Sequence, residues 1–492
     1  MPSSKFGRVR PHDPSNETAD ASLRDCFEID FDRVLYSAEF RRLAGVTQVI
    51  SPQDDYVFHD RLTHSLKVSQ MAARIASYLR RSYEAGHGKG SASSELKVNP
   101  TVCATAGLIH DIGHPPFGHA AETVLQEALN AGVKIGRGTN RALLADSFEG
   151  NAQSMRAIAR LSMRKHREKE QRGMNLTWRT LAAASKYPWT RDQQPQFYKT
   201  TGEKWGFYDS ERDYLDLLVE KRLIEPAQIG NAKNVEASIM DWADDIAYAV
   251  HDVEDFFRAG RIPLHSLSLS WESRDDDENG TWNQLLRRTS EKVSSYYSKQ
   301  EDAPTLGDIS ELAAEHIVTW LPSHPFDGSH RSHADIHTFG SAITTFLQSS
   351  CSIKNSAVGN GHALLISPEA RIIAEFLKST TVTFVINDPV VATMQRGQST
   401  AIRDVFEYLL ETTLKSFSKN DSWLAQRSLP PRLREYVGTS YAEAEPSDSE
   451  DALAARGVVD FLCSLTDKQT SLLHQRITGD SIQSLPPYWL TA

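Results

Sequence analysis

Two adjacent residues, His110 and Asp111, place an imidazole nitrogen beside a carboxylate oxygen. Such groups can bind one divalent cation if further ligands arrive from elsewhere in the chain. The residues before them, 102–109, are small and apolar, which predicts a buried helix. Charged groups at the end of a buried helix need a partner or a metal. A helix end on the surface is the alternative interpretation, and it requires no ligand.

Two remote positions offer the further ligands. His64 lies upstream, in the segment 61–65, and Asp244 lies downstream, in the segment 240–248. Two histidines and two carboxylates form a mixed nitrogen and oxygen set. Such a set suits Mn, Fe, Zn, Co or Mg better than it suits a soft metal or a structural thiolate site.

The helix predicted at 234–258 carries three polar residues on one face. Asp244, Tyr248 and Asp252 stand at i, i+4 and i+8, while apolar residues cover the other faces. Two acids and a phenol on one stripe of a largely buried helix are costly without a ligand. A solvated helix face explains the other acids of this helix, but neither Asp244 nor Asp252.

A second pair, His119 and Glu122, stands at i and i+3 on the helix predicted at 119–131. A carboxylate beside an imidazole raises the basicity of the ring and fixes its orientation. Such a pair can donate a proton to a leaving oxygen. The alternative is an ordinary acidic residue in the first turn of a helix.

Three cationic residues accompany these motifs. Arg61 precedes His64 by three residues, and Lys186 and Lys204 lie in aromatic-rich segments farther along the chain. Arginine can bind phosphate in bidentate fashion, whereas lysine acts as a point charge. The alternative is that all three serve as solubilising surface residues.

Length and composition are those of an ordinary globular protein. The chain has 492 residues, of which 40% are hydrophobic and 24% are charged. No apolar run is long enough to cross a bilayer, and four cysteines without paired spacing favour a reducing cytoplasm. The net charge of −10 argues against a general polyanion binder, although one phosphate-bearing ligand can still occupy a local basic pocket.

Helical periodicity dominates the chain, so we expect an all-α fold with one large core. The best strand candidate is the β-branched run 381–386, which helical patterns flank on both sides. The predicted helices are 31–43, 62–81, one ending at His110, 119–131, 149–164, 234–258 and 452–473. The predicted organisation is a mobile N-terminal arm at 1–30, a core at 31–260, an irregular insertion at 261–360, and a C-terminal helical region at 361–492 packed on the core.

Taken in order, these motifs resemble the deoxyguanosine triphosphate triphosphohydrolases of the HD-domain phosphohydrolase superfamily. The matching stretches are 40–43 with 47–49, 61–65, 110–119 with Glu122, 148–153, 186–188, 243–248 with 251–252, and 465–467. The resemblance covers most of the chain. It implies an HD-domain helical bundle core at 31–260 with appended C-terminal helices.

The resemblance also implies an activity, which is the hydrolysis of a deoxynucleoside triphosphate (dNTP) to deoxynucleoside and inorganic tripolyphosphate. The implied metal ligands are His64, His110, Asp111 and Asp244. The implied catalytic residues are His119, oriented by Glu122, and the nearby His114. The implied substrate-binding residues are Gln48, Arg61, Asn151, Lys186, Lys204, Tyr248 and Asp252. The metal would be Mn or Mg, with Fe, Co or Zn as alternatives.

The implied partners are the dNTP substrate, dNTP effectors, single-stranded DNA and further copies of the chain, in a tetramer or hexamer. Two segments depart from the family pattern. The motif at 465–470 lacks the Met and the Arg-Tyr-Ala ending that the family more often has, and 261–360 matches nothing. We expect both segments to lie away from the metal, so the departures leave the implied chemistry intact, while base preference, effector binding and assembly do not follow from the resemblance.

Two rival functions remain open at this point. One is a different HD-domain phosphohydrolase, such as a nucleotidase or a phosphodiesterase. The other is a nucleotide-sensing or nucleic-acid-binding protein without turnover, against which the intact pair of His119 and Glu122 argues.

Overall fold

In the computed structural model of the chain, the described residues are 24–48, 59–87, 96, 98–131, 143–166, 169–230, 232–297, 302–355, 362–417, 429–444, 446 and 448–480. Most of the predicted N-terminal arm, up to residue 23, lies outside them. The last residues of that arm are helical, because α2 (Cys26–Leu35) begins within it behind the capping residue Asp25.

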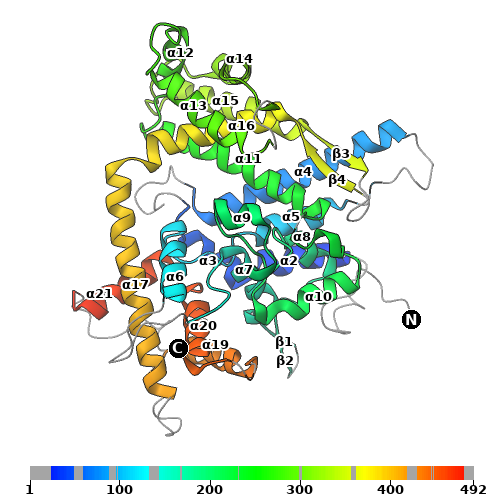
Figure 1. The fold of residues 1–492 in the computed structure, drawn as a ribbon, viewed down its shortest axis with the longest axis vertical. Coiled ribbons are helices and arrows are strands. Elements are labelled where there is room, and N and C mark those ends of the chain that lie inside the picture. The colour runs from blue at the N-terminus through cyan, green and yellow to red at the C-terminus, as the bar shows by residue number, and fades with distance from the viewer. Residues whose placement is uncertain are drawn as a thin grey trace.

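The described residues confirm the all-α prediction (Figure 1). The helices of the first half are α2, α3 (Ala38–Arg42), α4 (Arg61–His87), α5 (Pro100–Ile109), α6 (His119–Ala131), α7 (Gly150–Arg156), α8 (Trp178–Ala184), α9 (Gln196–Thr201), α10 (Arg212–Glu220) and α11 (Val235–Arg258). Those of the second half are α12 (Leu264–Glu272), α13 (Thr281–Ser294), α14 (Leu306–His316), α15 (His330–Ser349), α16 (Pro368–Thr381), α17 (Pro389–Phe417), α19 (Pro431–Ala442), α20 (Glu450–Leu462) and α21 (Asp467–Thr478).

Short elements complete the described fold. The 3-10 turns are η1 (Leu43–Gly45), η3 (Arg191–Gln193), η4 (Asp209–Glu211), η5 (Pro226–Gln228) and η7 (Val318–Trp320), and the π-helical turns are η2 (Ala157–Leu161) and η8 (Val382–Ile386). Two antiparallel hairpins pair β1 (Met163–His166) with β2 (Lys169–Arg172) and β3 (Cys351–Asn355) with β4 (His362–Ile366). Their registers place Met163 opposite Arg172 and Cys351 opposite Ile366.

The helices α4, α5 and α11 pack together at the centre and carry the residues with chemical potential. Asn99 caps the start of α5 with its side chain, and Pro100 occupies the first helical position. Close approach of α5 to α4 depends on Gly107, because a Cβ atom there would lie 2.7 Å from backbone atoms of Ser69. The apolar residues of α4 and α11 share one core cluster with those of α12 to α16.

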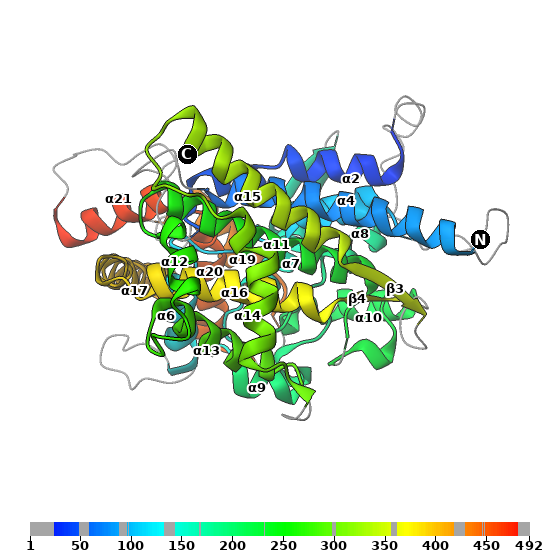
Figure 2. The same ribbon diagram turned by 90° about the horizontal axis from the view of Figure 1, so that it is seen from above.

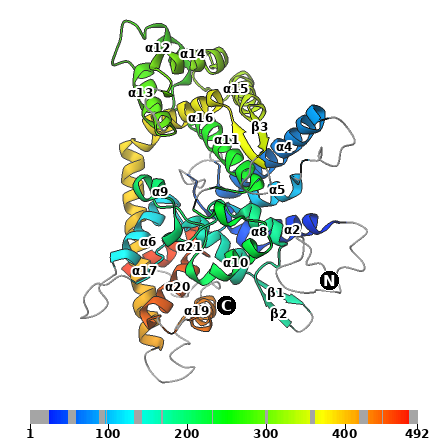
Figure 3. The same cartoon turned by 45° about the vertical axis from the view of Figure 1, so that its right-hand side comes forward.

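The second half of the chain forms two further groups of helices (Figures 1 and 3). The helices α12 to α16 lie at one end of the molecule, and viewed from above, α14, α15 and α16 lie over α11 (Figure 2). The long helix α17 runs down one side to the group of α19, α20 and α21 (Figure 3). Residues of α6, α17, α19, α20 and α21 share a separate apolar core. Among the described residues, no helix combines the length and apolar character needed to span a membrane.

The predicted irregular insertion at 261–360 is wrong, because this segment contains the helices α12, α13, α14 and α15. The histidines that suggest a polar loop in the sequence, such as His333 and His337, lie on the exposed side of α15. Ile336 and Phe339 lie on its buried side. An amphipathic helix with a very polar outer face therefore resembled a loop in the sequence.

The strand predicted at 381–386 is also wrong. Thr381 ends α16, and the next five residues continue it as a π-helical turn. Val385 packs into the apolar core under α12 to α16, so tertiary packing overrides the local preference of β-branched residues for strands. The helix predicted at 149–164 ends earlier, at Arg156, and a break between Cys463 and Thr466 splits the one predicted at 452–473.

Replacing Gly107 with alanine tests the close packing of α4 and α5. The added methyl group would meet the backbone of Ser69, so we expect the free energy of unfolding to fall by roughly 1–3 kcal/mol. Gly438→Ala in α19 is the matched control, because among the described residues no atom lies within 4 Å of its added Cβ. That control should be neutral or stabilising by up to about 1 kcal/mol. Chemical denaturation measures both variants, and equal stabilities would contradict the packing argument.

Candidate functional site

Three of the four predicted metal ligands converge where α4, α5 and α11 meet. His64, His110 and Asp244 each offer one ligand atom, and these atoms lie within 4.8 Å of one another. Nε2 of His64 lies 3.1 Å from Oδ1 of Asp244, and Nε2 of His110 lies 3.5 Å from the same oxygen. Separations of this size are those between neighbouring ligands of one ion with bonds of about 2.1 Å. The three atoms could therefore share one cation.

Asp111, the fourth predicted ligand, lies at the edge of this group. Its Oδ2 atom is 3.4 Å from Nε2 of His110 and accepts a hydrogen bond of 2.7 Å from Arg61. Its Oδ1 atom lies 3.0 Å from Nδ1 of His114. The carboxylate is therefore near the metal-ligand group, and it also connects that group to two further predicted site residues.

The backbone orients His110 toward the group. Its Nδ1 atom lies 2.8 Å from the carbonyl oxygen of Gly107, an acceptor, so Nδ1 carries the proton and Nε2 keeps its lone pair. Among the described residues, Nε2 is buried without a hydrogen-bond partner. A buried nitrogen with a free lone pair beside two carboxylates is the arrangement that a divalent cation satisfies, so the residues fit a metal.

Burial and charge act against each other at these ligands. Burial raises the pKa of Asp244, but Lys186 and His110 outweigh it and hold that pKa well below its usual value. Burial lowers the pKa of His110, but Asp111 and Asp244 outweigh it and raise that pKa. Burial dominates at His64, whose pKa is lowered. The carboxylates are therefore ionised, as metal ligands must be.

The pair of His119 and Glu122 forms a second group together with His114. Oε2 of Glu122 lies 2.6 Å from Nδ1 of His119, and Oε1 lies 3.5 Å from Nε2 of His114. The side chain of His119 is 70% exposed, whereas that of Glu122 is 9% exposed. A buried, fixed carboxylate thus holds an imidazole whose other nitrogen is accessible. That arrangement suits proton transfer to a bound ligand.

A tight turn links the two groups. Phe117 and Gly118 have φ angles of 65° and 57°, in the left-handed region. A Cβ atom on Gly118 would lie 2.9 Å from a guanidinium nitrogen of Arg61, so glycine is needed for both conformation and space. The turn therefore packs directly on the arginine that binds Asp111.

The start of α7 completes this side of the site with Glu149 and Gly150, two residues to which the sequence alone gives no role. Glu149 caps α7, and a Cβ atom on Gly150 would lie 2.5 Å from Oε1 of Glu122. Oε1 of Glu149 accepts hydrogen bonds from Lys204, at 3.0 Å, and from the side chain of Asn151, at 2.9 Å. The segment 148–153 is among the stretches that match the family. Only the hydrogen bonds from Lys204 and Asn151 in the structure show that Glu149 belongs to the site.

The predicted phosphate-binding residues therefore surround the two groups. Lys186 donates hydrogen bonds of 2.7 Å to Asp244 and forms an ion pair of 2.9 Å with Asp241. Burial lowers the pKa of Lys186, but these two carboxylates outweigh it and raise that pKa well above its usual value. Lys204 and Asn151 meet at Glu149. Both lysines are thus charged and lie beside acidic site residues.

Two predicted substrate-binding residues carry buried oxygen atoms without hydrogen-bond partners among the described residues, namely Oε1 of Gln48 and Oδ2 of Asp252. Burial, followed by the nearby Asp255, raises the pKa of Asp252 well above its usual value. Tyr248 stands one turn before Asp252 on α11 and is half-buried. Unsatisfied buried oxygens are costly, and a ligand hydroxyl group would satisfy them.

The segment 465–470, which we expect to lie away from the metal, contacts the turn that carries His119. Arg42 donates hydrogen bonds of 2.8 Å to the carbonyl oxygen of Leu465, and of 2.8 and 2.7 Å to those of Ile112 and His114. Asp467 accepts hydrogen bonds from Thr47 and from the backbone of Phe117, at 2.9 and 2.8 Å. The segment 465–467 is among the stretches that match the family. Its partners lie hundreds of residues away in the sequence, so no local sequence pattern predicts these contacts.

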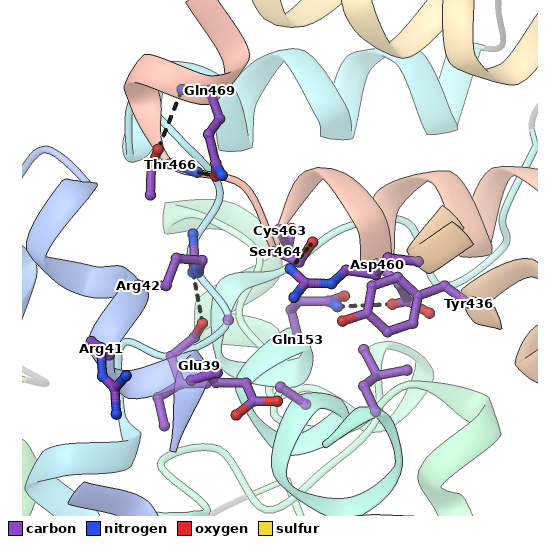
Figure 4. A pocket seen from close by; sticks show the side chains of 16 residues that line it. Glu39, Arg41, Arg42, Gln153, Tyr436, Asp460, Cys463, Ser464, Thr466 and Gln469 are labelled. Atoms are coloured by element: carbon purple, nitrogen blue, oxygen red, sulfur yellow. Dashed lines mark hydrogen bonds between the residues drawn. The ribbon is translucent and has the colours of Figure 1, made fainter. Parts of the chain in front are cut away.

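A pocket of about 420 Å³ lies between this C-terminal segment and residues of α3 and α7 (Figure 4). Ile112 and Gly113 form part of its wall, so it borders the site from behind. The side chain of Gln153, which donates a hydrogen bond of 2.8 Å to Asp460, crosses its floor (Figure 4).

Comparison with known families matches two parts of the chain. The model described as "HD domain" matches residues 61–249, and the one described as "Phosphohydrolase-associated domain" matches residues 364–476. The first match contains all four predicted metal ligands. The second contains α16 to α21 except the last residues of α21, and lies within the predicted C-terminal region.

Curated relatives match almost the whole chain. A deoxyguanosinetriphosphate triphosphohydrolase-like protein of Corynebacterium efficiens is 32% identical, with 94% of this chain and 93% of the relative covered. A protein of the same name in Streptomyces coelicolor is 30% identical, with 95% and 98% covered. A third, from Mesorhizobium japonicum, is 28% identical, with 97% and 98% covered. The chain therefore belongs to the deoxyguanosinetriphosphate triphosphohydrolase-like family of HD-domain phosphohydrolases.

Proposed function

We propose that this phosphohydrolase cleaves deoxynucleoside triphosphates, dGTP among them, into deoxynucleoside and inorganic tripolyphosphate. The observation that carries the proposal is the tight turn that joins a metal-ligand group to an exposed imidazole held by a buried carboxylate. The names of the relatives support the substrate class. The buried oxygens of Gln48 and Asp252 support a hydroxyl-bearing ligand beside that turn.

His64, His110, Asp111 and Asp244 would hold the metal, with Mn²⁺ or Mg²⁺ as the expected ion and Fe, Co or Zn as alternatives. When bound, a divalent cation neutralises charge on the reacting phosphate and activates water at neutral pH. Phosphoryl transfer depends mainly on positioning and charge stabilisation, so the surrounding cations matter as much. Arg61, with one guanidinium nitrogen unpartnered among the described residues, would bind phosphate oxygens.

His119 would supply the proton for the leaving 5′-oxygen of the sugar. Its Nδ1 atom is held by Glu122, so the accessible Nε2 atom faces the ligand and donates the proton. Burial raises the pKa of Glu122, but His114 and His119 outweigh it and hold that pKa well below its usual value. Glu122 therefore stays ionised and stabilises the protonated ring. His114 lies between Asp111 and Glu122 and would fix the position of the metal-ligand group relative to the pair of His119 and Glu122.

The remaining cations would bind the outer phosphates. Lys186 is bound to Asp244 and Asp241, and Lys204 to Glu149, so a triphosphate would take over part of their hydrogen bonding. Asn151 would bind beside Lys204. Gln48 and Asp252 would hold the 3′-hydroxyl group of the sugar, and Tyr248 would pack at C2′ and disfavour a ribose.

Product analysis tests the proposal directly. Purified protein with Mn²⁺ or Mg²⁺ is incubated with each of the four dNTPs, singly and in mixtures, and the products are separated by ion-exchange chromatography. Tripolyphosphate with deoxynucleoside supports the proposal, and acceleration in mixtures reveals nucleotide effectors. Orthophosphate or pyrophosphate would assign a different HD-domain phosphohydrolase. Binding of dNTPs without any hydrolysis would indicate that the protein is a nucleotide sensor.

Two alanine variants separate metal binding from proton transfer. His119→Ala should lower kcat by roughly a hundredfold or more, because the leaving oxygen loses its acid, and should bind Mn²⁺ as the wild type does. Asp244→Ala should lose both turnover and tight Mn²⁺ binding, since Asp244 lies within ligand distance of both histidines. Isothermal titration with Mn²⁺ and steady-state kinetics measure the two effects. Chelation of the metal should reproduce the activity loss of Asp244→Ala in the wild type.

The role of Asp252 is tested with a substrate that lacks the 3′-hydroxyl group. A buried group that loses its hydrogen-bond partner costs about 1–3 kcal/mol, so 2′,3′-dideoxy-GTP should show a kcat/KM roughly five to a hundredfold below that of dGTP. In Asp252→Ala this difference between the two substrates should shrink to the part that Gln48 contributes. A variant that still discriminates as strongly as the wild type would remove Asp252 from the sugar site.

A further inference from the structure

One carboxylate near the C-terminus joins two segments of the site that are far apart in the sequence. Asp467 is the first residue of α21 and is 5% exposed. Its Oδ2 atom accepts hydrogen bonds from the backbone N–H of Thr47, at 2.9 Å, and from the hydroxyl group of the same residue. Its Oδ1 atom accepts the backbone N–H of Phe117, at 2.8 Å.

Each of these two segments carries a residue of the proposed mechanism. Thr47 directly precedes Gln48, and its carbonyl oxygen accepts a hydrogen bond of 3.1 Å from Arg61. Phe117 begins the left-handed turn that ends in His119. A Cβ atom on Gly118 would lie 3.3 Å from the carbonyl oxygen of Thr47, so the segments are in contact. The carboxylate of Asp467 fixes how they sit against one another.

Arg42 makes a second connection between the C-terminal segment and the residues around His114. Its guanidinium group binds the carbonyl oxygen of Leu465, two residues before Asp467, and those of Ile112 and His114, which precede the turn. Arg42 therefore connects the C-terminal segment to the residues before the turn, while Asp467 binds the first residue of the turn. A segment that served only to cover the apolar core would need neither set of polar contacts.

We propose that Asp467 is a positioning residue for hydrolysis, which sets the placement of Gln48 relative to His119. The inference rests on the proposed function for the roles of these two residues. The C-terminal helices thereby become part of the catalytic apparatus. Sub-ångström placement strongly affects reactivity, because a bound substrate must meet its acid and its hydroxyl ligand at the same time.

The substitution Asp467→Asn tests the positioning role most directly. It keeps the shape of the side chain, but its amide NH₂ group faces an N–H donor in place of an acceptor, so one segment loses its anchor. We expect Asp467→Asn to lower kcat/KM for dGTP by about ten to a hundredfold, with Mn²⁺ affinity within about twofold of the wild type. Steady-state kinetics and titration with Mn²⁺ measure these values.

The matched control is Asp404→Asn. Oδ2 of Asp404 lies 2.9 Å from Nε2 of His474, which joins α17 to α21 without touching the turn. The same chemical change there loosens the same helix, so we expect kcat/KM to stay within about twofold of the wild type. Equal losses in both variants would mean that α21 contributes only its docking, and would overturn the proposal.

A double-mutant cycle with Gln48→Ala distinguishes positioning from general damage. If Asp467 acts through the Gln48 segment, the loss caused by Asp467→Asn should be at least halved in the Gln48→Ala background. An undiminished loss would overturn the proposal. If Asp467→Asn fails to fold, as judged by circular dichroism, Thr47→Val replaces it, because this variant removes only the hydroxyl donor. Thr47→Ser should then restore the wild-type rate, and an active Thr47→Val would count against the proposal.

The outcome is separable from that of the proposed function. If the wild type hydrolyses a different phosphate ester, the proposed function fails. The comparison of Asp467→Asn with Asp404→Asn is then made with that substrate, and a selective loss in Asp467→Asn still supports positioning of the His119 turn.

Discussion

The burial of ionised side chains at the end of α5 is the constraint on which the rest of this structure depends. Asp111 is almost inaccessible to solvent, and such a charge is stable only when a partner compensates for the lost hydration. Arg61 provides that partner at 2.7 Å, and is itself only 2% exposed. Arg61 in turn fixes the segment of Thr47, against which the turn packs. The neighbouring elements are placed so that the charge of Asp111 is not buried alone.

The residues of the metal-ligand group were predictable because each is a polar residue on, or directly after, a helix whose apolar face is buried. His64 on α4, His110 at the end of α5 and Asp244 on α11 are polar positions in buried segments, and a buried polar residue is an anomaly that sequence shows. The pairing of His119 with Glu122 followed from helical spacing alone. The roles of the predicted ligands and substrate contacts stay predictions.

The contacts of Asp467 could not be predicted, because 420 residues separate it from Thr47 and 350 from Phe117. Glu149 was missed for a related reason, since a capping residue at the start of a helix explains it without any partner from Lys204. The helices at 264–349 were missed because their polar faces dominate the composition. Contacts between residues far apart in the sequence thus explain the errors in the site. The polar outer faces of amphipathic helices explain the missed helices at 264–349.

The balance of charge explains why these pairs are suited to a polyphosphate. Without a ligand, Asp111 is paired with Arg61, and Asp244 is paired with Lys186, so the group is close to neutral. A divalent cation held by the same carboxylates would leave about two positive charges in a site from which water is largely excluded. Uncompensated positive charge is as costly there as negative charge. A triphosphate restores the balance, so metal and substrate should bind with mutual reinforcement.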